Sequence, residues 1–241
     1  MFDIVIPIGP SDISCISGQL VQTKKNIVGY RNIYLISYDT TLQIEGCTTI
    51  DERTFPFTIG DVASCHGSHS RNGWYLQQLL KLYAGFCIPG ILERYLVIDS
   101  DTFFLKPTEF IGDEKCLYNY GSEYHLPYFH HMARLHPTLT KVSSTMSGIC
   151  HHMMFETRFV KELFQLVEEL HKDDFWVVFL EQVDKDQDTR SGASEYEIYF
   201  NFMLQYHPDD IIVRPLRWAN VGKLDLGAAF DYVSYHHYMR S

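Results

Sequence analysis

The fold of this chain is decided by the stretch Tyr95-Leu96-Val97-Ile98-Asp99-Ser100-Asp101-Thr102-Phe103-Phe104. Its first four residues form an unbroken apolar run, which is typical of a short parallel strand buried on both faces. The two carboxylates follow where that strand ends, and open α/β sheets bind their ligands at the carboxyl edge of their strands. The stretch therefore predicts an α/β domain with a functional site at Asp99 and Asp101.

Asp99 and Asp101 are spaced so that both can bind one hard divalent cation. Mg²⁺ and Mn²⁺ take one or two carboxylates from a protein and complete their shell with water and phosphate oxygens. An Asp-x-Asp pair also occurs in turns and helix caps, so a structural acidic turn is the alternative. The apolar strand before the pair and the sequence Thr-Phe-Phe-Leu-Lys-Pro after it favour the metal site.

In this context the chain resembles the nucleotide-sugar glycosyltransferases of GT-A fold, whose Asp-x-Asp motif follows such a strand. The resemblance implies a GT-A-type, Rossmann-like α/β fold with a central, mainly parallel sheet flanked by helices. It also implies Mn²⁺ or Mg²⁺ as cofactor, a UDP- or GDP-sugar as donor and a hydroxyl-bearing glycan as acceptor. Ser100, between the two carboxylates, is then expected among the residues that bind the donor.

Length and composition are consistent with one domain of ordinary size. The chain has 241 residues, of which 46% are hydrophobic, enough for one α/β core. We expect one catalytic domain over residues 1–241, with the donor half in 1–101 and the acceptor half in 102–241. The net charge is −10 and there is no basic run, which disfavours nucleic acid as a partner.

The cysteines and the N-terminus bear on location. The six cysteines form no C-x-x-C pair, which favours free thiols in a reducing compartment over disulfides or zinc. The chain starts without a signal-peptide pattern, and no apolar run approaches the roughly 18 residues of a membrane span. We therefore expect no transmembrane segment and a cytoplasmic location, in bacteria or in a virus-infected host cell.

The first third of the chain alternates strands with helices. Apolar runs predict strands over residues 4–8, 33–36 and 48–51, and a helix-like spacing predicts a helix over 11–28. This alternation is typical of a nucleotide-binding βαβ half, but no glycine-rich dinucleotide or P-loop fingerprint is present. The strand ends expected near the base and ribose of the donor contribute Ile8, Gly9 and Asp39.

A long loop and a helix are expected before the Asp-x-Asp strand. Residues 55–71 are rich in Ser, Gly, His and Pro, which predicts a loop that a ligand orders over the site. The helix over 73–86 crosses back antiparallel to the strands, so it begins at the edge where Asp99 lies. This segment also resembles one in a poorly characterised bacterial and viral glycosyltransferase family. The residues assigned to the donor are Arg71, Trp74, Gln77 and Lys81, with ordinary packing as the alternative for Trp74.

The middle of the chain contains a small-residue turn and a histidine-rich segment. Residues 147–155 predict a turn entering a buried strand and resemble the loop that follows the donor site in GT-A enzymes. Gly148 would let the backbone approach the donor closely, and a plain turn is the alternative. The histidines within 123–139 do not have zinc-site spacing and are expected at the surface or in the acceptor cleft.

Acidic residues precede and open a later helix. Asp184, Asp186, Asp188 and Glu195 have the spacing of the carboxylates in an EF-hand calcium loop, but Thr189 stands where that loop needs Gly. We therefore expect residues 172–190 to form a solvated loop. Ser194 and Glu197 match a capping box, which leaves Glu195 to face the cleft. GT-A transferases commonly carry an acid/base residue here, and Glu195 is our candidate, with Glu197 as the alternative.

The C-terminal part offers further ligand contacts. A strand expected over 211–213 leads into residues that could contact phosphate or sugar, namely Arg217, Trp218 and Asn220. The tail over 232–238 resembles GT-A families in which a late His completes the metal shell. His236 and His237 are therefore candidate metal ligands, and an aromatic edge strand is the alternative.

Together these features predict a metal-dependent glycosyltransferase of hexosyltransferase type, moving a sugar to a glycan, glycolipid or glycoprotein hydroxyl. One alternative is a non-catalytic nucleotide- or carbohydrate-binding module of the same fold. A second is an aspartyl-phosphate phosphatase, which also ends a strand in Asp-x-Asp. That class expects Thr or Val where this chain has Phe103, and it has the motif near the N-terminus.

Overall fold

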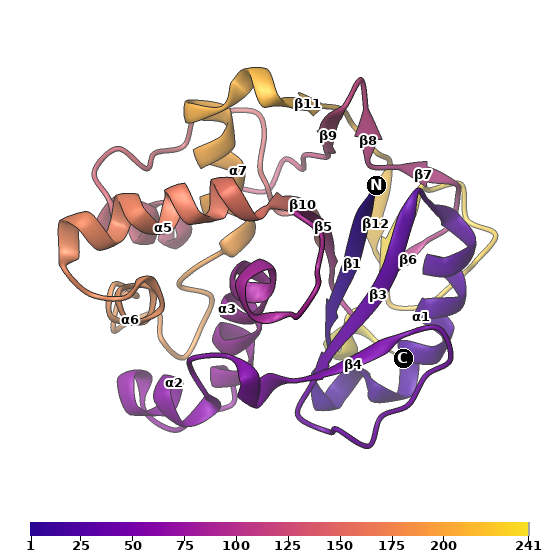
Figure 1. The fold of residues 1–241 in the computed structure, drawn as a ribbon, viewed down its shortest axis with the longest axis horizontal. Coiled ribbons are helices and arrows are strands. Elements are labelled where there is room, and N and C mark those ends of the chain that lie inside the picture. Colours follow the sequence, from indigo (N-terminus) through magenta and orange to yellow (C-terminus); the bar gives the residue numbers. More distant parts are fainter. Residues whose placement is uncertain (241) are drawn as a thin grey trace.

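A five-stranded sheet forms the centre of the computed structural model, which describes residues 1–240 (Figure 1). The strand order is β10-β5-β1-β3-β4, with all neighbours parallel except β10 and β5. The strands are β1 (Phe2–Pro7), β3 (Tyr30–Ser37), β4 (Thr48–Asp51), β5 (Arg94–Ile98) and β10 (His152–Glu156). The predicted α/β class with a mainly parallel central sheet is therefore confirmed.

Helices cover both faces of this sheet (Figure 1). The helix α1 (Ile13–Asn26) lies on one side, and α3 (Asn72–Cys87) and α5 (Thr157–His171) lie on the other. The remaining helices are α2 (Ile59–His66), α4 (Leu126–Leu135), α6 (Phe175–Glu181) and α7 (Glu195–Tyr206). Because the sheet is covered on both faces, β1 and β10 are buried along their whole length, as the apolar runs predict.

Smaller sheets extend the fold beyond the central one. One pairs β12 (Trp218–Asn220), β13 (Tyr232–Ser234) and β6 (Thr102–Phe104). Because β6 starts directly after Asp101, its pairing with β13 brings the C-terminal segment to the carboxyl edge of β5. The others comprise β11 (Ile211–Val213), β9 (Lys115–Tyr118) and β8 (Ile111–Gly112), and β2 (Ile27–Val28) with β7 (Thr108–Glu109).

Two segments expected to be loops contain helices instead. Residues 55–71 include α2, whose start is fixed by a full capping box between Thr58 and Asp61. Phe57 and Val62 are buried there, so apolar packing orders this segment without a ligand, contrary to the predicted loop. Likewise, 172–190 contains α6, of which Phe175 and Phe179 are fully buried. The histidine-rich segment contains α4, and its His131 is fully buried against the Phe179 carbonyl, contrary to the expected surface or cleft position.

The helices and the cysteines bear on the expected lack of a transmembrane segment and of disulfides. No helix within residues 1–240 is long and apolar enough to cross a membrane. The six cysteines are free thiols.

Candidate functional site

Asp99, Ser100 and Asp101 form the tight connection between β5 and β6. The Asp99 N–H donates to the carbonyl of His151 at 2.9 Å, and the Asp99 carbonyl accepts from the N–H of Thr102 at 2.9 Å. The buried Ser100 hydroxyl donates to Asp12 Oδ2 at 2.9 Å. Backbone and side-chain bonds thus fix both carboxylates at the predicted edge of the sheet.

A buried lysine on α3 joins the first carboxylate to the start of α7. Lys81 Nζ lies 2.5 Å from Asp99 Oδ1 and 2.6 Å from Glu195 Oε1. It also lies 4.4 Å from the centroid of the Tyr196 ring, and the Tyr196 hydroxyl donates to Asp99 Oδ1 at 2.8 Å. We call Lys81, Asp99, Glu195 and Tyr196 the Lys81 cluster. It pairs one cation with two carboxylates.

Charge pairing outweighs burial in setting the pKa values of Asp99 and Lys81, but not that of Glu195. Burial raises the pKa of Asp99, but Lys81 and His151 more than offset this and lower it below its usual value. Burial lowers the pKa of Lys81, but Asp99 and Glu195 raise it above its usual value. For Glu195 burial dominates and raises the pKa. Lys81 and Asp99 are therefore charged at neutral pH.

Asp101 lies beside the C-terminal segment and has one oxygen without a partner. Its Oδ2 is 2.8 Å from His236 Nδ1, while its buried Oδ1 has no hydrogen-bond partner among residues 1–240. The other nitrogen of His236, Nε2, lies 3.2 Å from Asn220 Oδ1. Burial lowers the pKa of His236, but Asp101 raises it above its usual value. A buried carboxylate oxygen without a partner needs an explanation, and a bound ion or water is one.

Arg240 fastens the C-terminal segment, residues 235–240, to the start of α1. Its guanidinium donates to Asp12 Oδ1 at 2.7 Å and to the Ser11 carbonyl at 3.1 Å. It also lies 5.1 Å from the centroid of the Tyr235 ring. Because Asp12 also binds Ser100, Arg240 ties this segment to the Asp-x-Asp turn. Asp101 makes two further contacts with the segment, from its carbonyl to the Tyr235 N–H at 2.8 Å and from its carboxylate to His236.

His151 lies beside Asp99, although the sequence predicts no role for it there. Its Nδ1 lies 3.4 Å from Asp99 Oδ2, and its ring contacts those of His236 and Trp218 at centroid distances of 4.8 and 5.1 Å. Its φ angle of +59° lies in the left-handed region. In the sequence, His151 and His152 stand directly before and at the start of a predicted strand. That strand is β10, and its start lies beside Asp99 because β10 runs antiparallel to β5.

The predicted donor residues on α3 do not all reach the site. Arg71 donates to the Arg190 carbonyl at 3.2 Å and packs over Trp74, so these two lie with the segment before α7. Gln77 is half-buried, whereas its neighbour Gln78 accepts the backbone N–H of Glu195 at 3.0 Å. Of the four residues assigned to the donor from this segment, Lys81 is the one in contact with Asp99.

The residues at the ends of β1 and β3 have local roles. The Ile8 N–H donates to the Ile36 carbonyl at 2.8 Å and extends the sheet toward Gly9. Asp39 Oδ1 accepts the backbone N–H and the hydroxyl of Thr41 at 2.9 and 2.6 Å. Their contacts with a donor stay predictions.

Gly148 and Glu197 connect the turn before β10 to α7. A Cβ at Gly148 would lie 2.5 Å from the Tyr196 carbonyl, so glycine is needed here to pack against α7. Glu197 accepts hydrogen bonds from the Ser147 hydroxyl and from Asn201. Its N–H donates to Ser194 Oγ at 3.3 Å, but its carboxylate is used elsewhere. Only half of the predicted capping box therefore forms.

The C-terminal candidates divide between site and surface. Trp218 stacks on Tyr232 at 5.6 Å and contacts His151, and Asn220 contacts His236, so both lie at the site. Arg217 is exposed and its backbone N–H donates to Asp231. His237 is exposed and contacts the Tyr238 ring.

The side chains at the Asp-x-Asp turn suit a hard cation that also binds the oxygens of a ligand. Within residues 1–240 no three His, Cys, Asp or Glu side chains are grouped as a metal site. Mg²⁺ and Mn²⁺ do not need such a cage when phosphate oxygens and waters supply the other positions. Asp101, with its unpartnered Oδ1, is the side chain best placed to hold the ion.

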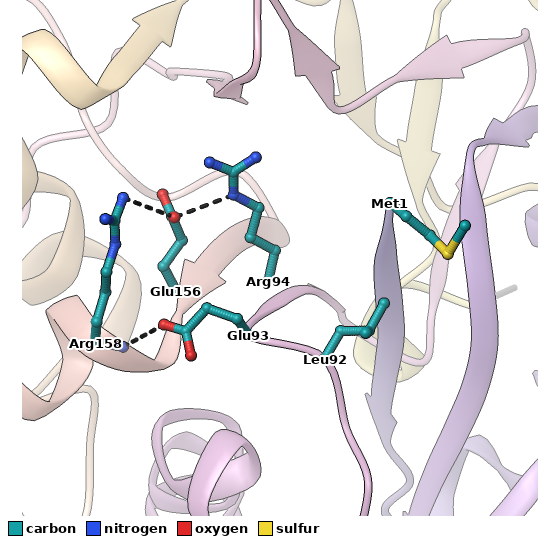
Figure 2. Close-up of a pocket in the computed structure, with 6 residues that line it drawn as sticks. All are labelled: Met1, Leu92, Glu93, Arg94, Glu156 and Arg158. Carbon is teal, nitrogen blue, oxygen red and sulfur yellow. Dashed lines mark hydrogen bonds and ion pairs between the residues drawn. The ribbon is translucent and has the colours of Figure 1, made fainter.

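A hollow at the opposite edge of the sheet is a separate feature (Figure 2). It is lined by Met1, Leu92, Glu93, Arg94, Glu156 and Arg158. Figure 2 shows both guanidinium groups directed at Glu156, which accepts from Arg94 at 3.1 Å and from Arg158 at 3.2 Å. Because Arg94 begins β5 and Asp99 follows its end, this hollow is distinct from the Asp-x-Asp site.

Comparisons with known proteins give a family and a number of similar solved structures. Residues 45–212 match the model of a family of unknown function, DUF6492. No curated protein matches the chain. The solved structure of mouse xyloside xylosyltransferase 1 in its apo form is similar, with a TM-score of 0.48 and 11% identity, over 91% of this chain and 87% of that one.

Proposed function

Because the chain belongs to DUF6492, a family of unknown function, we propose its activity from the site itself: divalent-metal-dependent transfer of a sugar from a UDP- or GDP-sugar to a hydroxyl acceptor. The observation that carries this proposal is the buried, unpartnered Oδ1 of Asp101 at the carboxyl end of β5. Leaving a buried charged oxygen unpaired costs more than about 1–3 kcal/mol. A bound cation with its diphosphate would offset that cost.

The residues of the site then have separate roles. Asp101 would hold Mn²⁺ or Mg²⁺, which when bound supplies Lewis-acid stabilisation of the leaving diphosphate. His236 holds the second oxygen of Asp101 and thereby fixes the carboxylate's orientation. Lys81 keeps Asp99 charged and immobile. Trp218, stacked on Tyr232, offers an indole at the rim for sugar or base.

Glu195 is the proposed acid/base residue toward the acceptor hydroxyl. Burial raises its pKa, which brings a carboxylate closer to the range useful for proton transfer near neutral pH. Lys81 fixes its Oε1 at 2.6 Å. Glu197 has a structural environment instead, since it accepts from Ser147 and Asn201 within the packing of α7.

A thermal-shift screen of UDP- and GDP-sugars tests the proposal. A ligand at about 100 times its Kd stabilises the native state by about 2.7 kcal/mol, or a rise in Tm of about 5–11 °C for a domain of this size. We expect that rise with Mn²⁺ and its loss in chelator or in Asp101→Asn. Release of UDP or GDP, followed by chromatography, then reports turnover.

The matched control is Asp113→Asn. Asp113 is exposed in the turn between β8 and β9 with a φ of +49°, which Asn adopts readily. This variant should respond like the wild type. An equal rise in Tm with chelator, or wild-type turnover in Asp101→Asn, would contradict the proposed function.

A further inference from the structure

His151 is held in an unusual backbone conformation next to the first carboxylate. Its φ is +59°, in a left-handed region that only a few per cent of residues other than Gly adopt, with Asn, Asp and His the most frequent among them. Its carbonyl accepts the Asp99 N–H at 2.9 Å, which anchors residue 151 beside the Asp-x-Asp turn. Such a conformation persists only where the surroundings impose it, and these positions concentrate at functional sites.

The imidazole of His151 is oriented from one side and unpartnered on the other. Its Nδ1 faces Asp99 Oδ2 at 3.4 Å, and the ring is in edge contact with His236 and Trp218. Its Nε2 is buried and has no hydrogen-bond partner in the described part of the chain. A carboxylate on one ring nitrogen and an available second nitrogen is how proteins commonly present imidazole to a metal.

The neighbouring side chains do not offer equivalent atoms. Asp99 Oδ1 receives hydrogen bonds from Lys81 at 2.5 Å and Tyr196 at 2.8 Å, and its Oδ2 faces His151. The two nitrogens of His236 face Asp101 Oδ2 and Asn220 Oδ1. Among these two carboxylates and two imidazoles, the unpartnered atoms are Asp101 Oδ1 and His151 Nε2, on residues that both contact His236.

We propose that Asp101 Oδ1 and His151 Nε2 are the two protein ligands of the divalent cation, and that Asp99 and His236 are positioning residues that orient them. This inference rests on the proposed function and changes the ligand set that the sequence predicted. Two protein ligands leave the other positions to phosphate oxygens and water. An imidazole ligand also favours Mn²⁺ over Mg²⁺, because Mg²⁺ prefers oxygen.

Electron spin-echo spectroscopy of Mn²⁺ bound with inorganic pyrophosphate tests the assignment. Pyrophosphate contains no nitrogen, so ¹⁴N modulation of the Mn²⁺ signal reports a protein ligand. We expect modulation in the wild type, in His236→Gln and in His237→Gln, and its loss in His151→Asn, since Asn adopts positive φ readily. Mn²⁺ affinity in His151→Asn should fall at least about tenfold, because even outer-shell changes cost about 10–100-fold.

The outcomes separate this inference from the proposed function. Bound Mn²⁺ without ¹⁴N modulation, or modulation lost in His236→Gln and kept in His151→Asn, overturns the ligand assignment alone. Failure of Mn²⁺ to bind with pyrophosphate overturns both. If His151→Asn does not fold, ¹⁵N-histidine labelling of the wild type decides. If the labelled wild type shows ¹⁵N in place of ¹⁴N modulation, and His236→Gln and His237→Gln both keep their modulation, the result supports His151 as the ligand. Unchanged ¹⁴N modulation in the labelled protein refutes it.

Discussion

Replacing Lys81 by Met should destabilise the protein more than any other single change in the Lys81 cluster. Lys81 is 3% exposed, and its ammonium lies 2.5 Å from Asp99 and 2.6 Å from Glu195. Met has a similar length and no charge, so the variant keeps the packing but leaves two buried carboxylates without a cation. Removing one partner of a buried ion pair costs about 3–5 kcal/mol.

That loss should be visible as a drop in Tm of about 6–20 °C, at about 2–4 °C per kcal/mol for a domain of this size. The assay is urea unfolding with calorimetry, in chelator so that metal binding does not contribute. Glu195→Gln alone should cost little, because the pair between Lys81 and Asp99 remains. The double variant Lys81→Met/Glu195→Gln should recover part of the loss, since one unpaired carboxylate has been removed.

The pH dependence gives a second test of the same reasoning. Without Lys81, burial raises the pKa of both carboxyls above their unfolded values. A carboxyl whose pKa is raised in the folded state loses stability as pH rises through that pKa. The stability that Lys81→Met loses relative to the wild type should therefore be smaller at pH 5 than at pH 7. Lys161→Met, an exposed site on α5, is the control. A deficit below about 1 kcal/mol, or no recovery in the double variant, would refute the charge-pairing argument.

Three further predictions concern packing and buried polar groups. Gly148→Ala should cost about 1–3 kcal/mol in urea unfolding, because the new Cβ would lie 2.5 Å from the Tyr196 carbonyl; a neutral change would mean that α7 shifts easily. Glu197→Ala should cost about 1–3 kcal/mol by stranding Ser147, whereas a well-folded but inactive Glu197→Gln would argue against a structural role. Burial lowers the pKa of His131 from 6.5 to about 3, so this one group should contribute a loss of stability of about 1.4 kcal/mol per unit as pH drops below about 6.5. His131→Gln should reduce the pH slope of stability by about that amount, while the buried His152 and His66 keep their own contributions; an unchanged slope would contradict the assignment.

The central sheet could be predicted because its signals are local. Continuous apolar runs mark β1, β3 and β5, and each is buried as such runs require. The short helix α2 gave a weaker signal, since eight residues contain few turns of periodicity. Its one distinctive feature was the capping pair Thr58 and Asp61, within a segment whose Ser, Gly and His content suggested a loop. Burial of Phe57 and Val62 decides its structure, and that burial depends on α3 and α6.

The place of the Asp-x-Asp turn in the fold could be predicted better than the contacts of the side chains around it. The Asp-x-Asp turn lies at the carboxyl edge of β5, as its apolar strand implied. The helical stripe that Lys81 shares with Trp74 and Gln77 predicts a donor contact, yet Lys81 is buried between two carboxylates. A helical stripe indicates which side chains share a face, but only the packing of α3 against α7 shows what that face contacts.

The direction of β10 explains why His151 could not be found from the sequence. In a wholly parallel sheet, a residue just before a strand lies at the amino edge, opposite the ligands. β10 instead runs antiparallel to β5, with His152 paired to Ile98, so its beginning meets the end of β5 at the Asp-x-Asp turn. Strand direction is set by long-range connections and not by the apolar pattern, which is the same for both directions. One reversed strand therefore brings an imidazole from the far side of the sheet to the carboxylates, and the candidate ligand set follows from topology as much as from the motif.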